Sequence, residues 1–357
     1  MIGINSTIST YVETLKRSNV PIQDLIPGDK LYEYKTNNLL EVRNVKKLPK
    51  NVIWEITYND GRLSYVSSSD LLFTGSKICK TIPADDMCLV RNPIDNAPVL
   101  LDTIQQYPVK FQNRGFIDTL KPDPYIAGAL LIHGDFDDEY INLPMDRESA
   151  DNHFAHRYNL DFSQMKVGKR RCYYQYNGAP KSKAIKWVDF FKGHHIYATT
   201  KCREDPIISP CYTRASMTNR WKFIMGAFDI GYSKSIFPDT ISISANDEYR
   251  LVLIQRMLCS MGVLSKVSYD GSINDKIGRC YRLDIVGSYD TFPGFFYDIE
   301  HINRILQNHN RKFNFEPKFE LRIESIKRYT EGYMYNVELN KPHAIYIDSN
   351  FLPRISI

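Results

Sequence analysis

Several common signatures of location and chemistry are missing from this sequence of 357 residues. No apolar run approaches the roughly 20 residues needed to cross a bilayer. The opening residues, MIGINSTIST, contain neither the basic region nor the apolar region of a secretory signal. We therefore expect an intracellular protein, in the cytoplasm or the nucleus, that is not secreted and has no membrane partner.

Cysteine and histidine usage excludes several classes of site. The seven cysteines are scattered, their number is odd, and none of them forms a CxxC pair. This pattern indicates reduced, structural thiols rather than a disulfide scaffold or a zinc ribbon. The histidine pairs His153/His156 and His194/His195 have no cysteine or acidic partner at a recognised spacing. The P-loop, the dinucleotide-binding glycine fingerprint and the GxSxG elbow are also absent.

Charge is unevenly distributed, although the formal net charge is only +5. Thirteen basic residues lie between Lys166 and Lys222, opposed by only three acidic ones, and aromatic residues are interleaved with them. A solvated surface would explain this run, but contact with nucleic-acid phosphates explains the aromatic residues as well. The candidates for phosphate contact are Lys166, Lys169, Arg170, Arg171, Lys181, Lys183, Lys186 and Arg214.

The length of the chain predicts two or three domains, and residues 1–105 read as β-rich. In Ile22–Tyr34, IQDLIPGDKLYEY, the Pro-Gly-Asp triplet predicts a turn between two short strands. Asn59-Asp60-Gly61 predicts a hairpin turn between strands at Val52–Tyr58 and Leu63–Val66. Residues 106–122 carry Pro and Gly and read as a connector.

Two short apolar stretches, Tyr125–Phe136 and Phe223–Tyr232, each contain a glycine followed by alanine. Gly128 and Gly226 leave a surface without side chains, where two helices can approach backbone to backbone. The alternative is two ordinary buried helices that end near glycine. The second stretch is followed by a strand pattern at Ile241–Ser244 and a helical pattern at Asp247–Gly262. Further strand patterns follow at Val263–Tyr269 and Tyr281–Val286, and residues 288–318 read as helical.

Taken together, these two stretches resemble the doubled motif of LAGLIDADG homing endonucleases. In that family the two motif helices form the interface between two similar half-domains. The resemblance implies a pseudo-two-fold αββαββα domain whose curved antiparallel sheets lie on double-stranded DNA. It also implies metal-assisted hydrolysis, because the last acidic residue of each family motif holds a divalent cation.

The acidic positions of the two motifs are altered in this chain. Aligned on the two glycines, they fall on His133 and Gly231. Asp135 is a stand-in for the first position if that helix ends late, whereas Asp229 lies about 200° around a helix from the second position. The resemblance therefore gives Asp135, Asp229, His133 and Lys266 as catalytic candidates, with Asp135 and Asp229 as metal ligands. Mg²⁺ is implied only if cleavage is retained, because Mg²⁺ prefers oxygen ligands.

The two ends of the chain resemble a second family. Ile22–Tyr34 and Tyr335–Ser356 are similar to the terminal blocks of inteins, which build a Hint-type β-domain, and His343 matches a histidine of those blocks. Splicing requires a thiol or hydroxyl nucleophile, an assisting histidine and a terminal asparagine. The corresponding residues here are Ile2, Asp70 and Ile355, so we expect that the chain cannot splice.

The sequence thus predicts an α+β protein: a Hint-like all-β domain made from both chain ends and an inserted LAGLIDADG-like domain. The expected ranges are 1–110 and 313–357 for the first domain and 111–312 for the second, with halves at about 120–205 and 212–300. The expected function is site-specific binding of double-stranded DNA by an internally pseudo-symmetric monomer, with cleavage lost or reduced. The alternatives are an active Mg²⁺-dependent endodeoxyribonuclease and a silent structural or protein-interaction remnant.

Overall fold

The structure, a computed structural model, is an α+β fold that divides into two compact units. It describes residues 5–7, 11–17, 20–67, 71–73, 78–84, 87–91, 107–111, 124–133, 135–136, 141–142, 166–167, 172–174, 210–231, 242–245, 248–269, 281–285, 321, 323–342 and 344–356. Unit 1 comprises Met1–Arg114, Leu258–Lys266 and Lys318–Ile357, and unit 2 comprises Gly115–Met257 and Val267–Pro317.

Unit 1 is built from strands contributed by both ends of the chain. Its main sheet has the order β1-β17-β5-β4, with β6 also paired to β5. Its elements are β1 Asn5–Thr7, β2 Tyr11–Val12, β3 Val20–Pro21, η1 Ile22–Asp24, β4 Lys30–Tyr32, β5 Leu39–Tyr58, β6 Leu63–Ser67, β7 Leu71–Phe73, β8 Ile78–Ala84, β9 Met87–Arg91, β17 Ile323–Leu339, β18 Ile345–Ile347 and β19 Pro353–Ile355.

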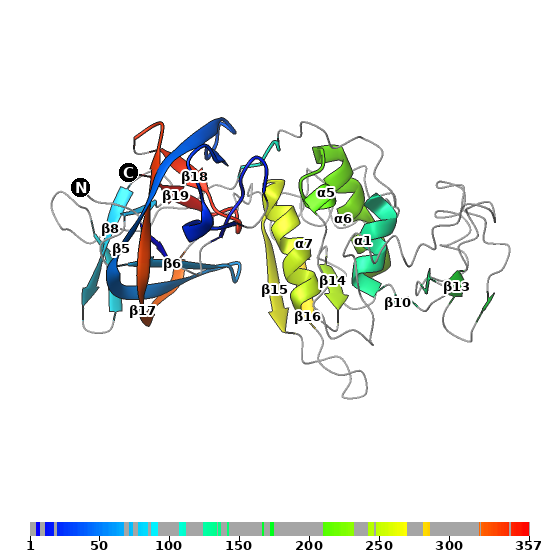
Figure 1. Cartoon of the computed structure of the whole chain (residues 1–357). Helices are drawn as coiled ribbons and strands as arrows, with labels where there is room; N and C mark the ends of the chain where they lie inside the picture. Colours follow the sequence, from blue (N-terminus) through cyan, green and yellow to red (C-terminus); the bar gives the residue numbers. More distant parts are fainter. Residues whose placement is uncertain are drawn as a thin grey trace, which may run out of the picture. The chain divides into compact units, whose positions relative to one another are not determined.

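The two longest strands, β5 and β17, hold unit 1 together. They pair antiparallel from Ile323 opposite Tyr58 to Leu339 opposite Val42, with four register irregularities along the ladder. Figure 1 shows the blue β5 lying beside the orange β17. The sequence predicted a strand only at Val52–Tyr58, but β5 begins at Leu39. Residues 39–51 are strand residues because they pair with β17, which comes from the opposite end of the chain.

Turns in unit 1 follow the predicted glycines. The hairpin turn between β5 and β6 is confirmed, with Gly61 at φ 84° and its N–H donating to the Tyr58 carbonyl at 2.8 Å. Gly28 has φ 92°, which only glycine adopts without strain, so the Pro-Gly-Asp turn is confirmed as well. The run before that turn was predicted as a strand, but Ile22–Asp24 forms a 3₁₀ turn.

Two buried clusters form the core of unit 1. One gathers Val12, Leu31, Val42 and Val337 around the part of the sheet nearest β4. The other contains Trp54 and other residues of the β5–β6 hairpin, together with residues of the C-terminal hairpin, which is formed by β18 and β19. Each cluster combines residues from both chain ends, so neither end can bury its apolar side chains without the other.

Unit 2 contains the two predicted motif helices and two small antiparallel sheets. The sheets have the orders β10-β11-β13-β12 and β14-β16-β15. The elements are α1 Pro124–His133, β10 Asp135–Phe136, β11 Ile141–Asn142, β12 Lys166–Val167, β13 Cys172–Tyr174, α5 Pro210–Thr213, α6 Met217–Gly231, β14 Ser242–Ala245, α7 Glu248–Ser260, β15 Ser265–Tyr269 and β16 Tyr281–Ile285; α7 and β15 cross the division between the units. No described helix is both long and apolar enough to span a bilayer.

The two motif helices pack against each other, as the sequence predicted. A Cβ placed on Gly128 of α1 would lie 1.8 Å from the carbonyl oxygen of Phe223 on α6 and 3.2 Å from the amide nitrogen of Ala227. Figure 1 shows α1 beside α6. Only glycine permits an approach this close, so this position fixes how the two helices meet.

The elements that follow α6 are confirmed within two residues of their predicted bounds. Helix α7 buries Leu251, Ile254, Met257 and Leu258, the apolar positions of the helical pattern. The strands on either side, β14 and β15, join β16 in one sheet. The helix predicted over residues 288–318 lies outside the described residues.

We expect Gly128→Ala to destabilise unit 2, because the added methyl group would collide with the Phe223 carbonyl. Overpacking of this kind costs about 1–3 kcal/mol. Alanine otherwise favours a helix by about 1 kcal/mol over glycine. Urea unfolding, with hydrogen exchange of the α1 and α6 amides as the local readout, measures the effect.

Thr218→Ala is the matched control, because Thr218 is an exposed residue of α6, one of the two packed helices. Its unfolding free energy should change by less than about 0.5 kcal/mol. An unchanged or higher unfolding midpoint for Gly128→Ala would show that the close approach of the two backbones does not exist.

Candidate nucleic-acid interface

The ends of α1 and α6 coincide with the altered motif positions. Helix α1 ends at His133 and helix α6 ends at Gly231. Asp135 was expected to replace the first motif acid if α1 continued past His133; instead, Asp135 begins strand β10, opposite Asn142. Asp229 lies inside α6, two residues before its end. The side chains of His133, Asp135 and Asp229 lie outside the described part of the structure, so their catalytic roles stay predictions.

A guanidinium group caps the end of α1. Arg250, in the first turn of α7, donates from Nη1 to the carbonyl of Ile132 at 3.2 Å. The carbonyls of a last helical turn carry partial negative charge, which a cation stabilises. The position directly before the altered motif residue is therefore bonded to a positively charged side chain.

The residues at the two helix ends do not fit Mg²⁺. Of the two motif positions, one carries an imidazole and the other has no side chain, whereas Mg²⁺ requires oxygen donors. The bonded guanidinium of Arg250 adds positive charge beside the first position. Among the described residues, no group of three or more His, Cys, Asp or Glu side chains could hold a metal ion.

The predicted phosphate contacts are placed only in part. Lys166 lies in β12, opposite Tyr173, and Lys266 is an exposed residue of β15. Arg214, which follows α5, is only 3% exposed, so its side chain packs inside the protein. The other predicted contacts lie outside the described residues: Lys169, Arg170, Arg171, Lys181, Lys183 and Lys186.

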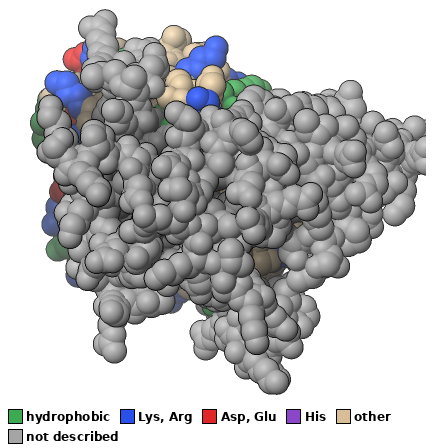
Figure 2. Space-filling model, turned by 90° about the vertical axis from the view of Figure 1, so that its right-hand side faces the viewer, with side chains coloured by type: hydrophobic (Ala, Val, Ile, Leu, Met, Phe, Trp, Pro, Cys, Tyr) green, Lys and Arg blue, Asp and Glu red, His purple; other side chains and the backbone are tan. Residues whose placement is uncertain are grey.

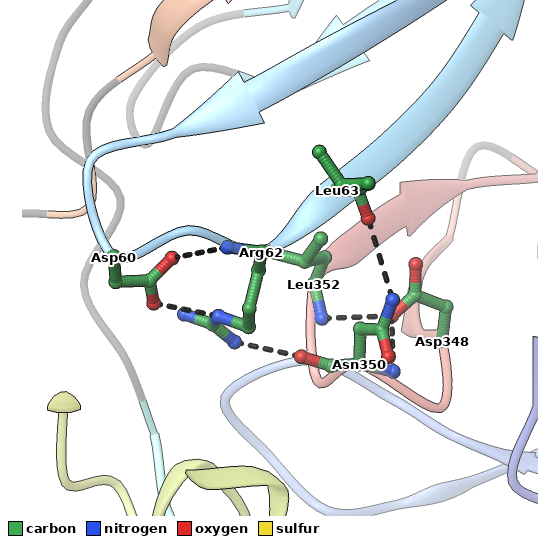
Figure 3. Close-up of polar contacts among 6 residues, drawn as sticks. All are labelled: Asp60, Arg62, Leu63, Asp348, Asn350 and Leu352. Carbon is green, nitrogen blue, oxygen red and sulfur yellow. Dashed lines mark hydrogen bonds and ion pairs between the residues drawn. The ribbon is translucent and has the colours of Figure 1, made fainter. Parts of the chain in front are cut away.

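In unit 1, a buried polar cluster joins the β5–β6 turn to the C-terminal hairpin (Figure 3). Arg62 pairs with Asp60 at 2.7 Å and donates from Nη1 to the Asn350 carbonyl at 2.7 Å. The Asn350 side-chain amide donates to the Leu63 carbonyl at 3.3 Å. These bonds connect residues almost 290 positions apart in sequence, so they fix the C-terminal hairpin on β5 and β6.

Asp348 organises the other side of this cluster. One of its oxygens accepts hydrogen bonds from the backbone N–H groups of Asn350 and Leu352, at 2.8 and 3.0 Å. The other accepts from Nε of Arg354 at 3.0 Å. Burial acts to lower the pKa of Arg354, but the Asp348 carboxylate, together with Tyr58 and Tyr346, outweighs it, and the pKa is raised above its ordinary value. Arg354 therefore stays charged, and Asp348 neutralises it.

The positions on which the predicted loss of splicing rests are mostly not described. Ile2, Asp70 and His343 lie outside the described residues, and Ile355 is a strand residue of β19 opposite Ile345. The pairing of Asp348 with Arg354 was not predicted from the sequence. The triplet Asp348-Ser349-Asn350 is typical of a turn in which an aspartate accepts from nearby backbone N–H groups, and this signal would have located the acidic partner.

Comparison with known proteins gives only weak structural similarity. No protein-family model and no curated protein sequence matches the chain. Mesophilic variants of the homing endonuclease I-DmoI match with 14% identity and a TM-score of 0.31, over 46% of this chain and 82% of theirs. I-DmoI in complex with DNA and Mn matches with 14% identity and a TM-score of 0.28, over 46% of this chain and 90% of that one. Similarity this low carries no argument about function.

We expect Asp348→Asn to destabilise unit 1 by about 3–5 kcal/mol, because Arg354 would stay buried without its carboxylate. Urea unfolding measures the change. In the double variant Asp348→Asn/Arg354→Met, much of the lost stability should return, since no buried charge is left without its partner.

Glu331→Gln provides the comparison for an exposed ion pair. Glu331 and Arg328 lie 3.3 Å apart with side chains 63% and 55% exposed, so the change should stay below about 0.5 kcal/mol. Equal losses for Asp348→Asn and Glu331→Gln would contradict the assignment of Asp348 as a structural charge.

Proposed function

We propose that this protein binds specific sites in double-stranded DNA through unit 2, that it does not splice, and that it cleaves DNA weakly or not at all. The observation that carries the proposal is the contact of α1 with α6 at Gly128. A doubled glycine motif whose two helices meet backbone to backbone is the arrangement that the LAGLIDADG resemblance implies.

The elements after each motif helix support the same proposal. An antiparallel sheet follows α1 in sequence, and a second one is formed by strands that follow α6. Antiparallel strands can enter the major groove, where side chains distinguish all four base pairs. The basic residues between Lys166 and Lys222 would neutralise phosphates, so affinity would fall steeply as salt rises.

The chemistry at the helix ends supports binding without efficient cleavage. Neither motif position carries a carboxylate, and the carbonyl of Ile132 is bonded to the Arg250 guanidinium. Two-metal hydrolysis of a phosphodiester needs acidic ligands on both sides of the scissile bonds. We therefore assign the protein to recognition of DNA, with the buried helix pair as its scaffold.

Selection from a random duplex library, with and without Mg²⁺, tests this function. We expect enrichment of one family of bound sites, affinity that decreases with salt, and little or no Mg²⁺-dependent product. Absence of salt-sensitive binding would overturn the proposal and favour a structural or protein-interaction remnant. Efficient cutting in Mg²⁺ would overturn the loss of cleavage, and Asp135→Ala would then show whether Asp135 is a ligand.

Restoring both motif acids tests the chemical explanation. On a selected site, His133→Asp/Gly231→Asp should raise Mg²⁺-dependent cutting well above that of the unmodified protein. The matched control is His133→Asn/Gly231→Asn, which has nearly the same shape without the charges. Equal cutting by the two variants would show that missing carboxylates are not what limits cleavage.

A further inference from the structure

A bulge in the β5–β17 ladder brings two lysines onto one tyrosine. Gly332 lies opposite Asn51, and Met334 lies opposite Leu48. Between these pairs, β17 contributes only Tyr333, whereas β5 contributes Pro49 and Lys50. Proline has no N–H to donate to a ladder, which explains why the pairing is interrupted at Pro49.

The bulge changes the direction of the side chains. In a regular strand, residues three apart point to opposite faces. Lys47 and Lys50 are three apart, yet Lys47 Nζ lies 3.6 Å and Lys50 Nζ 5.2 Å from the centre of the Tyr333 ring. The extra residue of a bulge re-aims the chain in this way. Both ammonium groups therefore lie near the same ring, and cation–π attraction favours both.

The two lysines at this bulge have no acidic partner in the described part of the chain. Lys47 and Lys50 are both exposed, and neither forms an ion pair with a described residue. Glu331, the acidic residue nearest in sequence to Tyr333, pairs with Arg328 instead. Figure 2 shows lysine and arginine side chains at the top of the view, where an acidic group lies beside some of them.

Exposed lysines without an acidic partner are available to bind an anion. We infer that Lys47 and Lys50, with Tyr333, form a second DNA-contacting surface, on unit 1, that binds the phosphates of a duplex. This inference rests on the proposed function and extends it, because it assigns a DNA contact to the β-domain made from both chain ends.

Duplex phosphates fit this surface for two reasons. Lysine ammonium groups bind phosphate as point charges without a fixed direction, so they suit a repeating backbone rather than a single shaped ligand. Tyr329 is 53% exposed on the same β17 strand, and such side chains are common donors to phosphate oxygens. The contact is therefore expected to add affinity for any sequence and to add little specificity.

Binding to a duplex of random sequence, measured over a range of salt concentrations, tests the inference. The test variant is Lys47→Gln/Lys50→Gln. The control variant, Lys16→Gln/Lys30→Gln, removes the same charge from two other exposed lysines of unit 1. The variant Lys47→Arg/Lys50→Arg keeps the charge, and urea unfolding checks that each variant is folded.

Loss of two phosphate contacts should lower the slope of log affinity against log salt by about two. We expect this change, with at least about tenfold weaker binding at low salt, for the test variant only, and near-normal binding for the arginine variant. Equal behaviour of the test and control variants would overturn the second surface and leave the proposed function intact. No binding by the unmodified protein would overturn both.

Discussion

The ladder between β5 and β17 is the interaction on which unit 1 depends. It joins residues 39–58 to residues 323–339, so it cannot form until the chain between them has closed on itself. The entropy cost of closure rises only slowly with the length of the closed segment. Burial then offsets it, because Val42 and Val337 share one core cluster and Trp54 and Ile347 share the other. The insertion of unit 2 between these strands is tolerated for the same reason.

The structure places charge in two different ways along this ladder. Near the β5–β6 turn, Arg62 and Arg354 are buried, and each has a carboxylate within 3.0 Å. At the bulge, Lys47 and Lys50 are exposed and face an aromatic ring instead of an acid. A buried arginine must be paired, whereas an exposed lysine can keep its charge for a partner. The first arrangement therefore belongs to the scaffold, and the second to recognition.

Much of the fold followed from local patterns in the sequence. The Asn59-Asp60-Gly61 turn, the periodic apolar residues of α7 and the glycines of α1 and α6 all carry their signal within a few residues. Features that depend on a distant partner were missed. Pro49 predicts the end of a strand, yet β5 continues through it because β17 pairs with β5 on both sides of Pro49. Pro49 lies in a bulge, where its missing N–H costs no ladder hydrogen bond. The 3₁₀ turn at Ile22–Asp24 was read as a strand because its apolar spacing suits both forms.

The candidate sites divide in the same way. The motif positions could be found from sequence alone, because glycine spacing identifies the helices and His133 and Gly231 then follow by counting. Arg250 could not, because its contact with Ile132 crosses 118 positions. Nor could Arg214 be recognised as buried, since a run of basic residues does not show which of them face inward. The lysines at the bulge were not singled out, because three-residue spacing normally separates side chains onto opposite faces.

The distance between β5 and β17 also affects how the protein is made. The 265 positions from Tyr58 to Ile323 must be translated before β17 exists, which takes on the order of 15–50 seconds. During that wait β5 has no β17 edge to pair with, and a free strand edge invites pairing with other chains. Pro49 and the lysines around it interrupt such pairing, as proline and lysine do on the exposed edges of other sheets. We therefore expect the segment from Lys47 to Lys50, which also shapes the charged surface, to limit aggregation of the nascent chain.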